Sequence, residues 1–70
     1  MNTWVIKNAW LSIGGEIQWE LYRNGRCAMI GAPYTKCAAK VIDEREDGDV
    51  FFVEDTDGTK TAICNVQVTA

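Results

Sequence analysis

The sequence has no histidine, a single proline and only three cysteines among its 70 residues. Histidine is the side chain most used for proton transfer near neutral pH, and it is a common metal ligand. Three cysteines without histidine fall short of a four-ligand zinc site, and their odd number does not match the paired disulfides of small secreted domains. We therefore expect no enzyme, no cofactor and no metal site, and we expect reduced thiols in a cytoplasmic protein.

Long apolar runs are missing as well. No stretch reaches the roughly 18 apolar residues that a membrane-spanning helix needs. Residues 1–15 lack the pattern of a secretion signal, because the one early cation, Lys7, lies inside the apolar run. The length and the 47% share of hydrophobic residues predict one globular domain over residues 1–70.

Positive and negative charges are divided along the chain. Residues 1–42 carry a net charge of +3, and residues 43–70 carry −6, which together make the net charge of −3. Eight of the ten acidic residues lie within residues 43–57. This density would repel a phosphate backbone, so we do not expect direct nucleic-acid binding, whereas it would attract a basic protein surface. The alternative is that these acids only keep the chain in solution.

Two strands and a tight turn are predicted in the first half, after a first strand over residues 3–13. Residues 16–22 alternate between apolar and polar positions, and Asn24-Gly25 is typical of a two-residue type I′ hairpin turn. Such a turn pairs Arg23 with Arg26, Tyr22 with Cys27, Leu21 with Ala28 and Trp19 with Ile30.

The periodicity then changes to that of a helix. Apolar residues recur at helical spacing over residues 34–45, namely Tyr34, Cys37, Ala38, Val41 and Ile42. After Gly48, residues 50–54 and 59–68 read as a second hairpin around Asp57-Gly58. A two-residue turn there pairs Asp55 with Lys60 and Phe52 with Ile63, and it places Phe51, Val53, Ala62, Cys64, Val66 and Val68 toward the core.

This order predicts an α+β fold, an antiparallel sheet of about five strands with one helix (β-β-β-α-β-β). A small SH3-like β-barrel is the alternative if residues 36–45 form a strand. The segments IQWELYRNG and PYTKCAAKVIDE resemble the small YegP-like domains over residues 17–44. The match consists of the Asn24-Gly25 turn in the first segment, and of Tyr34 and the pair Ala38-Ala39 in the second. That family has no established activity, so the resemblance implies only the strand-strand-helix order.

Two acidic motifs in the sequence resemble known chemical sites. Residues 43–54 approach a calcium-binding loop, with Asp43, Asp47, Gly48 and Glu54 at matching positions, but Arg45 occupies a ligand position and strand sequence follows. Residues 50–59 resemble the first motif of haloacid-dehalogenase phosphatases, whose two aspartates match Asp55 and Asp57. The chain is too short to supply the other residues of that chemistry, and a hairpin explains Asp57-Gly58.

The most informative prediction concerns a surplus of apolar side chains. A single helix covers one face of a sheet, so we expect Tyr22, Cys27, Met29, Val50, Phe52 and Ile63 to remain on the other face. A contiguous exposed apolar face on a small protein is typical of an interaction surface. Coverage by the first strand or by barrel closure is the alternative.

The sequence therefore predicts a non-catalytic protein-binding module. By analogy of size and charge, it would be an inhibitor that occupies the basic, nucleic-acid-handling surface of a larger protein, as phage-encoded anti-host and anti-CRISPR proteins do. The alternatives are a homo-oligomeric structural protein and, third, a divalent-metal-binding protein that uses the acids of 43–57. The predicted partner-binding residues are Asp43, Glu44, Glu46, Asp47, Asp49, Glu54, Asp57, Tyr22, Phe52 and Ile63.

Overall fold

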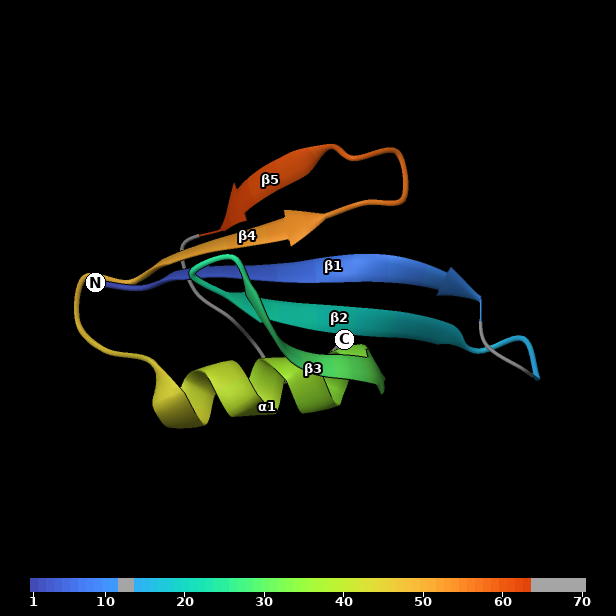
Figure 1. Ribbon diagram of the computed structural model, residues 1–70, viewed down its shortest axis with the longest axis horizontal. Coiled ribbons are helices and arrows are strands. Elements are labelled where there is room, and N and C mark those ends of the chain that lie inside the picture. Colours follow the sequence, from blue (N-terminus) through green and yellow to red (C-terminus); the bar gives the residue numbers. More distant parts are fainter. Residues whose placement is uncertain (12–13, 64–70) are drawn as a thin grey trace.

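The computed structural model describes residues 1–11 and 14–63. Within these residues, five strands and one helix follow one another in the predicted β-β-β-α-β-β order (Figure 1). The elements are β1 (Thr3–Leu11), β2 (Ile17–Arg23), β3 (Arg26–Ala32), α1 (Tyr34–Glu44), β4 (Val50–Glu54) and β5 (Lys60–Ile63). The strands form one sheet in the order β3-β2-β1-β4-β5, which confirms the α+β class. Within the described residues the sheet is open, with β3 and β5 at its edges, so the barrel alternative is wrong.

One pair of strands departs from the predicted antiparallel sheet. β1 pairs with β2 in antiparallel fashion and with β4 in parallel fashion, with Trp4 opposite Phe51 and Ile6 opposite Val53. β1 and β3 run in the same direction because both pair antiparallel to β2. The connection from β3 to β4 contains α1, and such a long crossover returns the chain so that β4 runs parallel to β3 and β1. The sheet is therefore mixed, and its central strand is the first one in the chain.

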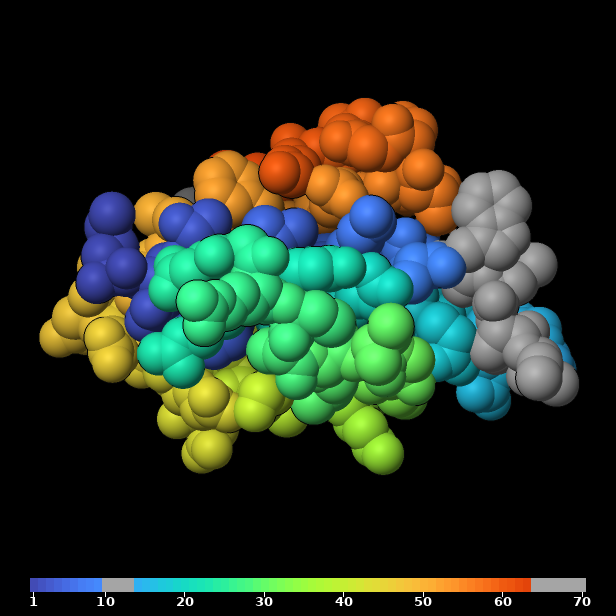
Figure 2. All heavy atoms as spheres, in the orientation of Figure 1, coloured from blue at the N-terminus to red at the C-terminus, as the bar shows by residue number. Residues whose placement is uncertain are grey.

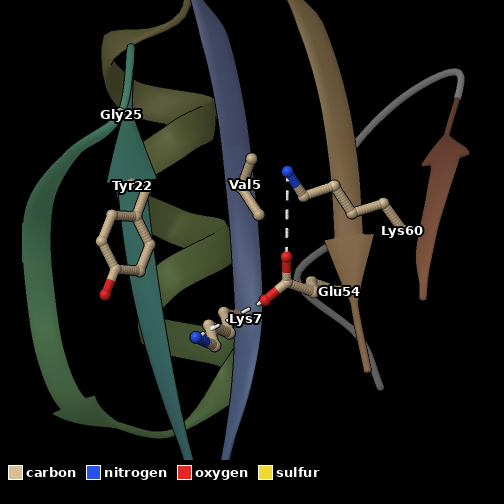
Figure 3. A pocket seen from close by; sticks show the side chains of 6 residues that line it. All are labelled: Val5, Lys7, Tyr22, Gly25, Glu54 and Lys60. Carbon is tan, nitrogen blue, oxygen red and sulfur yellow. Dashed lines mark ion pairs between the residues drawn. The ribbon is translucent and has the colours of Figure 1, made fainter. Parts of the chain in front are cut away.

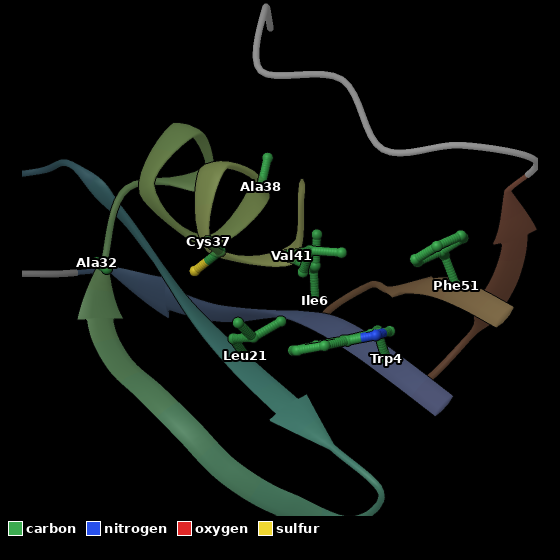
Figure 4. Close-up of a cluster of buried hydrophobic side chains, with 8 residues drawn as sticks. All are labelled: Trp4, Ile6, Leu21, Ala32, Cys37, Ala38, Val41 and Phe51. Carbon is green, nitrogen blue, oxygen red and sulfur yellow. The ribbon is translucent and has the colours of Figure 1, made fainter. Parts of the chain in front are cut away.

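α1 covers one face of the sheet over β1, β2 and β3. It begins after Pro33, and it ends where the Arg45 N–H bonds the Val41 carbonyl oxygen at 2.8 Å, so the predicted helix over 34–45 is confirmed to within one residue. The helix and the sheet together bury one apolar cluster (Figure 4). Its members are Trp4, Ile6, Leu21, Ala32, Cys37, Ala38, Val41 and Phe51.

The first hairpin has the predicted turn but a different register further along. Asn24 and Gly25 both have positive φ, at 52° and 81°, as a type I′ turn requires. Tyr22 pairs with Cys27 and Arg23 with Arg26, as predicted. Beyond that point two irregularities shift the pairing, so that Leu21 faces Met29 and Trp19 faces Ala32.

These shifts decide which side chains of β3 reach the core. The predicted pairs of Leu21 with Ala28 and of Trp19 with Ile30 are wrong, because each bulge adds a residue and a one-residue slip moves a side chain to the opposite face. Met29 consequently packs against the core, and its sulfur lies 3.9 Å from the Cys37 sulfur. Ile30 is 70% exposed.

The second hairpin is also shifted by one residue. Its turn is longer than predicted: the Asp55 N–H bonds the Thr59 carbonyl at 2.9 Å, and Gly58 takes a φ of +87°. Glu54 therefore pairs with Lys60, and Phe51 pairs with Ile63. The predicted pairs of Asp55 with Lys60 and of Phe52 with Ile63 are wrong. The predicted core positions Cys64, Val66 and Val68 lie outside the described residues.

Candidate interaction surfaces

Asp49, one of the predicted partner-binding residues, has a structural role within the fold. Its carboxylate accepts hydrogen bonds from the backbone N–H of Asn2 at 2.6 Å and of Glu46 at 3.0 Å. It also accepts one from Trp4 Nε1 at 2.8 Å and one from Asn2 Nδ2 at 3.2 Å. Desolvation by itself raises the pKa of this carboxyl, but the four donors outweigh it and hold the pKa well below its usual range. A residue predicted to bind a partner thus joins the start of β1 to the loop before β4.

Three of the predicted acids are exposed together around the C-terminal end of α1. We call Asp43, Glu46 and Asp47 the acidic end. Glu44 lies beside them but is paired with Lys40 within the helix and with Arg23, whose Nη1 is 3.5 Å away. The hydrogen bond from Lys40 is the main reason why the pKa of Glu44 is lowered. Arg23 also stacks over Trp4, 5.2 Å from its ring centroid.

The remaining acids lie elsewhere, so residues 43–57 do not form one acidic surface. The five residues of β4 separate Asp49 from Asp55, which places their Cα atoms about 20 Å apart. Figure 2 shows the loop after α1, in yellow, and the β4–β5 turn, in orange, in different parts of the molecule. Asp57 accepts the Thr59 N–H at 2.9 Å, a contact that belongs to the turn and is the main reason why its pKa is lowered.

Neither acidic motif forms a metal site in the part of the chain that the structure describes. No group of three or more cysteine, aspartate or glutamate side chains there could hold a metal ion. In the calcium-loop match, Asp43 belongs to α1 whereas Glu54 ends β4. Asp55 and Asp57, matched to the phosphatase motif, are exposed residues of a hairpin turn.

The face of the sheet opposite α1 has a band of apolar side chains across all five strands. The registers place Val5 beside Tyr22 and Phe52, and they place Tyr22 beside Cys27 and Phe52 beside Ala62. We call these five residues the apolar stripe. Tyr22, Cys27 and Phe52 are there as predicted. Met29 and Ile63 instead pack against the core, so Ile63 does not share a face with Phe52.

A row of alternating charges runs next to the apolar stripe. In the strand registers, Lys7 lies opposite Glu20 on β2 and opposite Glu54 on β4, and Glu54 lies opposite Lys60 on β5. We call Glu20, Lys7, Glu54 and Lys60 the charge ladder, with signs −, +, −, + across four strands. The Glu54 carboxylate lies 3.6 Å from Lys7 Nζ and 3.9 Å from Lys60 Nζ, and its side chain is only 14% exposed (Figure 3).

The apolar stripe and the charge ladder meet at a shallow depression. It measures about 290 Å³ and is lined by Val5, Lys7, Tyr22, Gly25, Glu54 and Lys60. Figure 3 shows these side chains in front of the sheet, with α1 behind it. The Tyr22 hydroxyl donates to Glu20 at 2.8 Å, and this bond to a carboxylate is the main reason why the pKa of Tyr22 is raised. No described helix or strand lies over this face.

The open face could be predicted from the sequence, whereas the charge ladder could not. The ladder depends on the register of β4 and β5 and on the parallel pairing of β1 with β4, neither of which local patterns determine. The role of Asp49 was missed for the same reason, since its donors come from the other end of the chain.

No family model, curated protein or solved structure matches this chain. α1, with 11 residues, is too short and too polar to cross a membrane, and it is the one helix of the described residues.

Proposed function

We propose that this chain is a non-catalytic, cytoplasmic protein-binding module whose acidic end engages a basic surface on another protein. The observation that carries the proposal is the exposure of Asp43, Glu46 and Asp47 at the negative end of α1. By analogy of size and charge, the partner is a nucleic-acid-handling protein, and the chain is an inhibitor of the kind that phages direct against host or CRISPR machinery. The odd number of cysteines, which does not match the paired disulfides of small secreted domains, supports a reducing compartment.

The residues of the acidic end lie where negative charge lowers the stability of α1. A helix carries partial negative charge at its C-terminal end, so cations are favoured in the last turn and acids in the first. α1 has no basic residue in its last turn and no acid in its first. Residues that oppose a local preference, here the preference for cations at the C-terminal end of a helix, without stabilising the fold in another way are expected at functional sites. Binding to a basic partner would supply the stabilisation that these acids do not receive within the fold.

The fold also separates the acidic end from the open face of the sheet. The acidic end belongs to α1 and the loop after it, whereas Tyr22 and Phe52 lie on the face away from α1. A flat partner surface therefore cannot cover both. Exposed carboxylates act mainly on the association rate and on partner choice, and their effect falls as salt is added.

Charge reversal at the acidic end tests the proposal without weakening the fold. Replacing acids by lysine in Glu46→Lys/Asp47→Lys improves the match to the helix dipole, so thermal stability should stay equal or rise. The matched control is Glu16→Lys/Asp55→Lys, which makes the same change of charge at exposed positions elsewhere.

The readout is affinity purification with mass spectrometry, followed by titration of the captured protein as a purified component. We expect a protein with a basic surface to be retained by the natural chain and by the control but lost by Glu46→Lys/Asp47→Lys. Its affinity should fall as salt rises. Equal capture by both double variants would show that the acidic end is not the contact.

A further inference from the structure

We propose that the open face of the sheet is the contact between two copies of this chain, related by a twofold axis. The inference rests on the charge ladder and the apolar stripe, and it does not depend on the proposed function of the acidic end. α1 and the acidic end lie on the far side of each copy, so they stay exposed in the pair.

The sign pattern of the charge ladder is self-complementary. Read from β2 to β5, the signs are −, +, −, +, and the reverse order is opposite at every position. We place a twofold axis parallel to the strands and midway between β1 and β4. The charge ladder of one copy then lies over the charge ladder of the second copy, with the order of the strands reversed. Lys7 then faces Glu54 of the second copy, and Glu20 faces its Lys60. Because a twofold contact uses the same patch on both copies, each pairing occurs twice.

The apolar stripe matches under the same axis. Val5 on β1 comes opposite Phe52 of the second copy on β4, and Tyr22 on β2 comes opposite its Ala62 on β5. A large side chain thus meets a small one in both pairings, which is the arrangement that lets two layers interdigitate. Sheets that pack face to face keep their strands within about 30° of each other, at a spacing of about 10 Å, and this axis keeps the strands aligned.

Charge also favours a second copy over a basic partner on this face. The chain carries a net charge of −3, yet the charge ladder sums to zero. Two copies can therefore meet here without the repulsion that their acidic ends would cause. A strongly basic surface would gain nothing from Glu54, which already lies between Lys7 and Lys60.

The ladder makes a sharp test possible within a single chain. Lys7→Glu places a carboxylate opposite Glu54 of the second copy, twice per pair. Lys7→Glu/Glu54→Lys changes the signs to −, −, +, +, a pattern that is again opposite to its own reverse. Lys36→Glu, at an exposed position on α1, makes the same change of net charge as Lys7→Glu away from the face.

Sedimentation equilibrium from micromolar to millimolar protein measures the association, and circular dichroism at the lowest concentration confirms that each variant is folded. We expect the natural chain and Lys36→Glu to form dimers with similar affinity. Lys7→Glu should weaken dimerisation more than about tenfold, because like charges set against each other oppose association. Lys7→Glu/Glu54→Lys should recover most of this loss.

Three results would overturn the proposal. The first is a natural chain that stays monomeric throughout the concentration range. The second is a dimer that Lys7→Glu leaves intact or that Lys36→Glu weakens equally. The third is a folded double variant that dimerises no better than Lys7→Glu. None of these results bears on partner capture by the acidic end, so the two proposals stand or fall separately.

Discussion

Truncating two neighbouring residues of β1 tests whether side chains on the two faces of the sheet are buried to different extents, as the structure indicates. Ile6 points toward α1 and is 1% exposed, whereas Val5 points to the open face and is half-buried. Ile6→Ala removes three buried carbons, at about 0.8 kcal/mol each, and leaves a cavity, for a loss of about 3 kcal/mol. Val5→Ala removes two half-buried carbons and should cost about 0.8 kcal/mol.

Urea unfolding monitored by tryptophan fluorescence measures the difference. A domain of this length is expected to have about 3.5–10 kcal/mol of stability, so Ile6→Ala is a large fraction of the total. With a denaturant dependence of about 1 kcal/mol/M, the midpoint should fall by about 3 M for Ile6→Ala and by under 1 M for Val5→Ala. Low protein concentration keeps self-association out of the measurement.

Equal midpoint shifts for the two variants would contradict this prediction. That result would mean that Val5 is as well covered in the single chain as Ile6, and the open face would not be available for contact. An Ile6→Ala chain that is unfolded without urea still agrees with the prediction, provided that Val5→Ala folds.

Two further predictions concern the anchoring of β1. Because the folded-state pKa of Asp49 is depressed, its contribution to stability is present at neutral pH and is lost as pH falls below the ordinary aspartate range, near about 4. Asp49→Asn should therefore lower the melting temperature at pH 7 and show a weaker dependence on acid; melting curves that stay parallel to those of the natural chain from neutral to low pH would contradict this role. Asn24 has a φ of 52° and accepts the Thr3 N–H at 2.9 Å through its side chain. Asn24→Ala should cost about 1–2 kcal/mol and Asn24→Gly less, since glycine adopts positive φ without strain; thermal unfolding that ranks the two variants the other way would show that strain in the turn is not the main term.

Local patterns were sufficient for the order of the elements. The helical spacing from Tyr34 to Ile42 predicts α1 because an apolar stripe of that period must be buried against the sheet. Asn24-Gly25 predicts the first turn because few other pairs adopt positive φ at both positions. The sequence also predicts an uncovered face, since a helix of 11 residues cannot cover both sides of the five strands that the structure describes.

Pairing between distant segments is what only the tertiary structure decided. The bulges of β3 and the longer β4–β5 turn each move side chains by one position, and a single position reverses the face on which Met29 and Ile63 lie. The parallel pairing of β1 with β4 places Lys7 beside Glu54 and brings Asn2 and Trp4 to Asp49. Local sequence specifies which residues alternate, but the register across strands depends on the packing of the whole sheet against α1. The charge ladder exists only in that register.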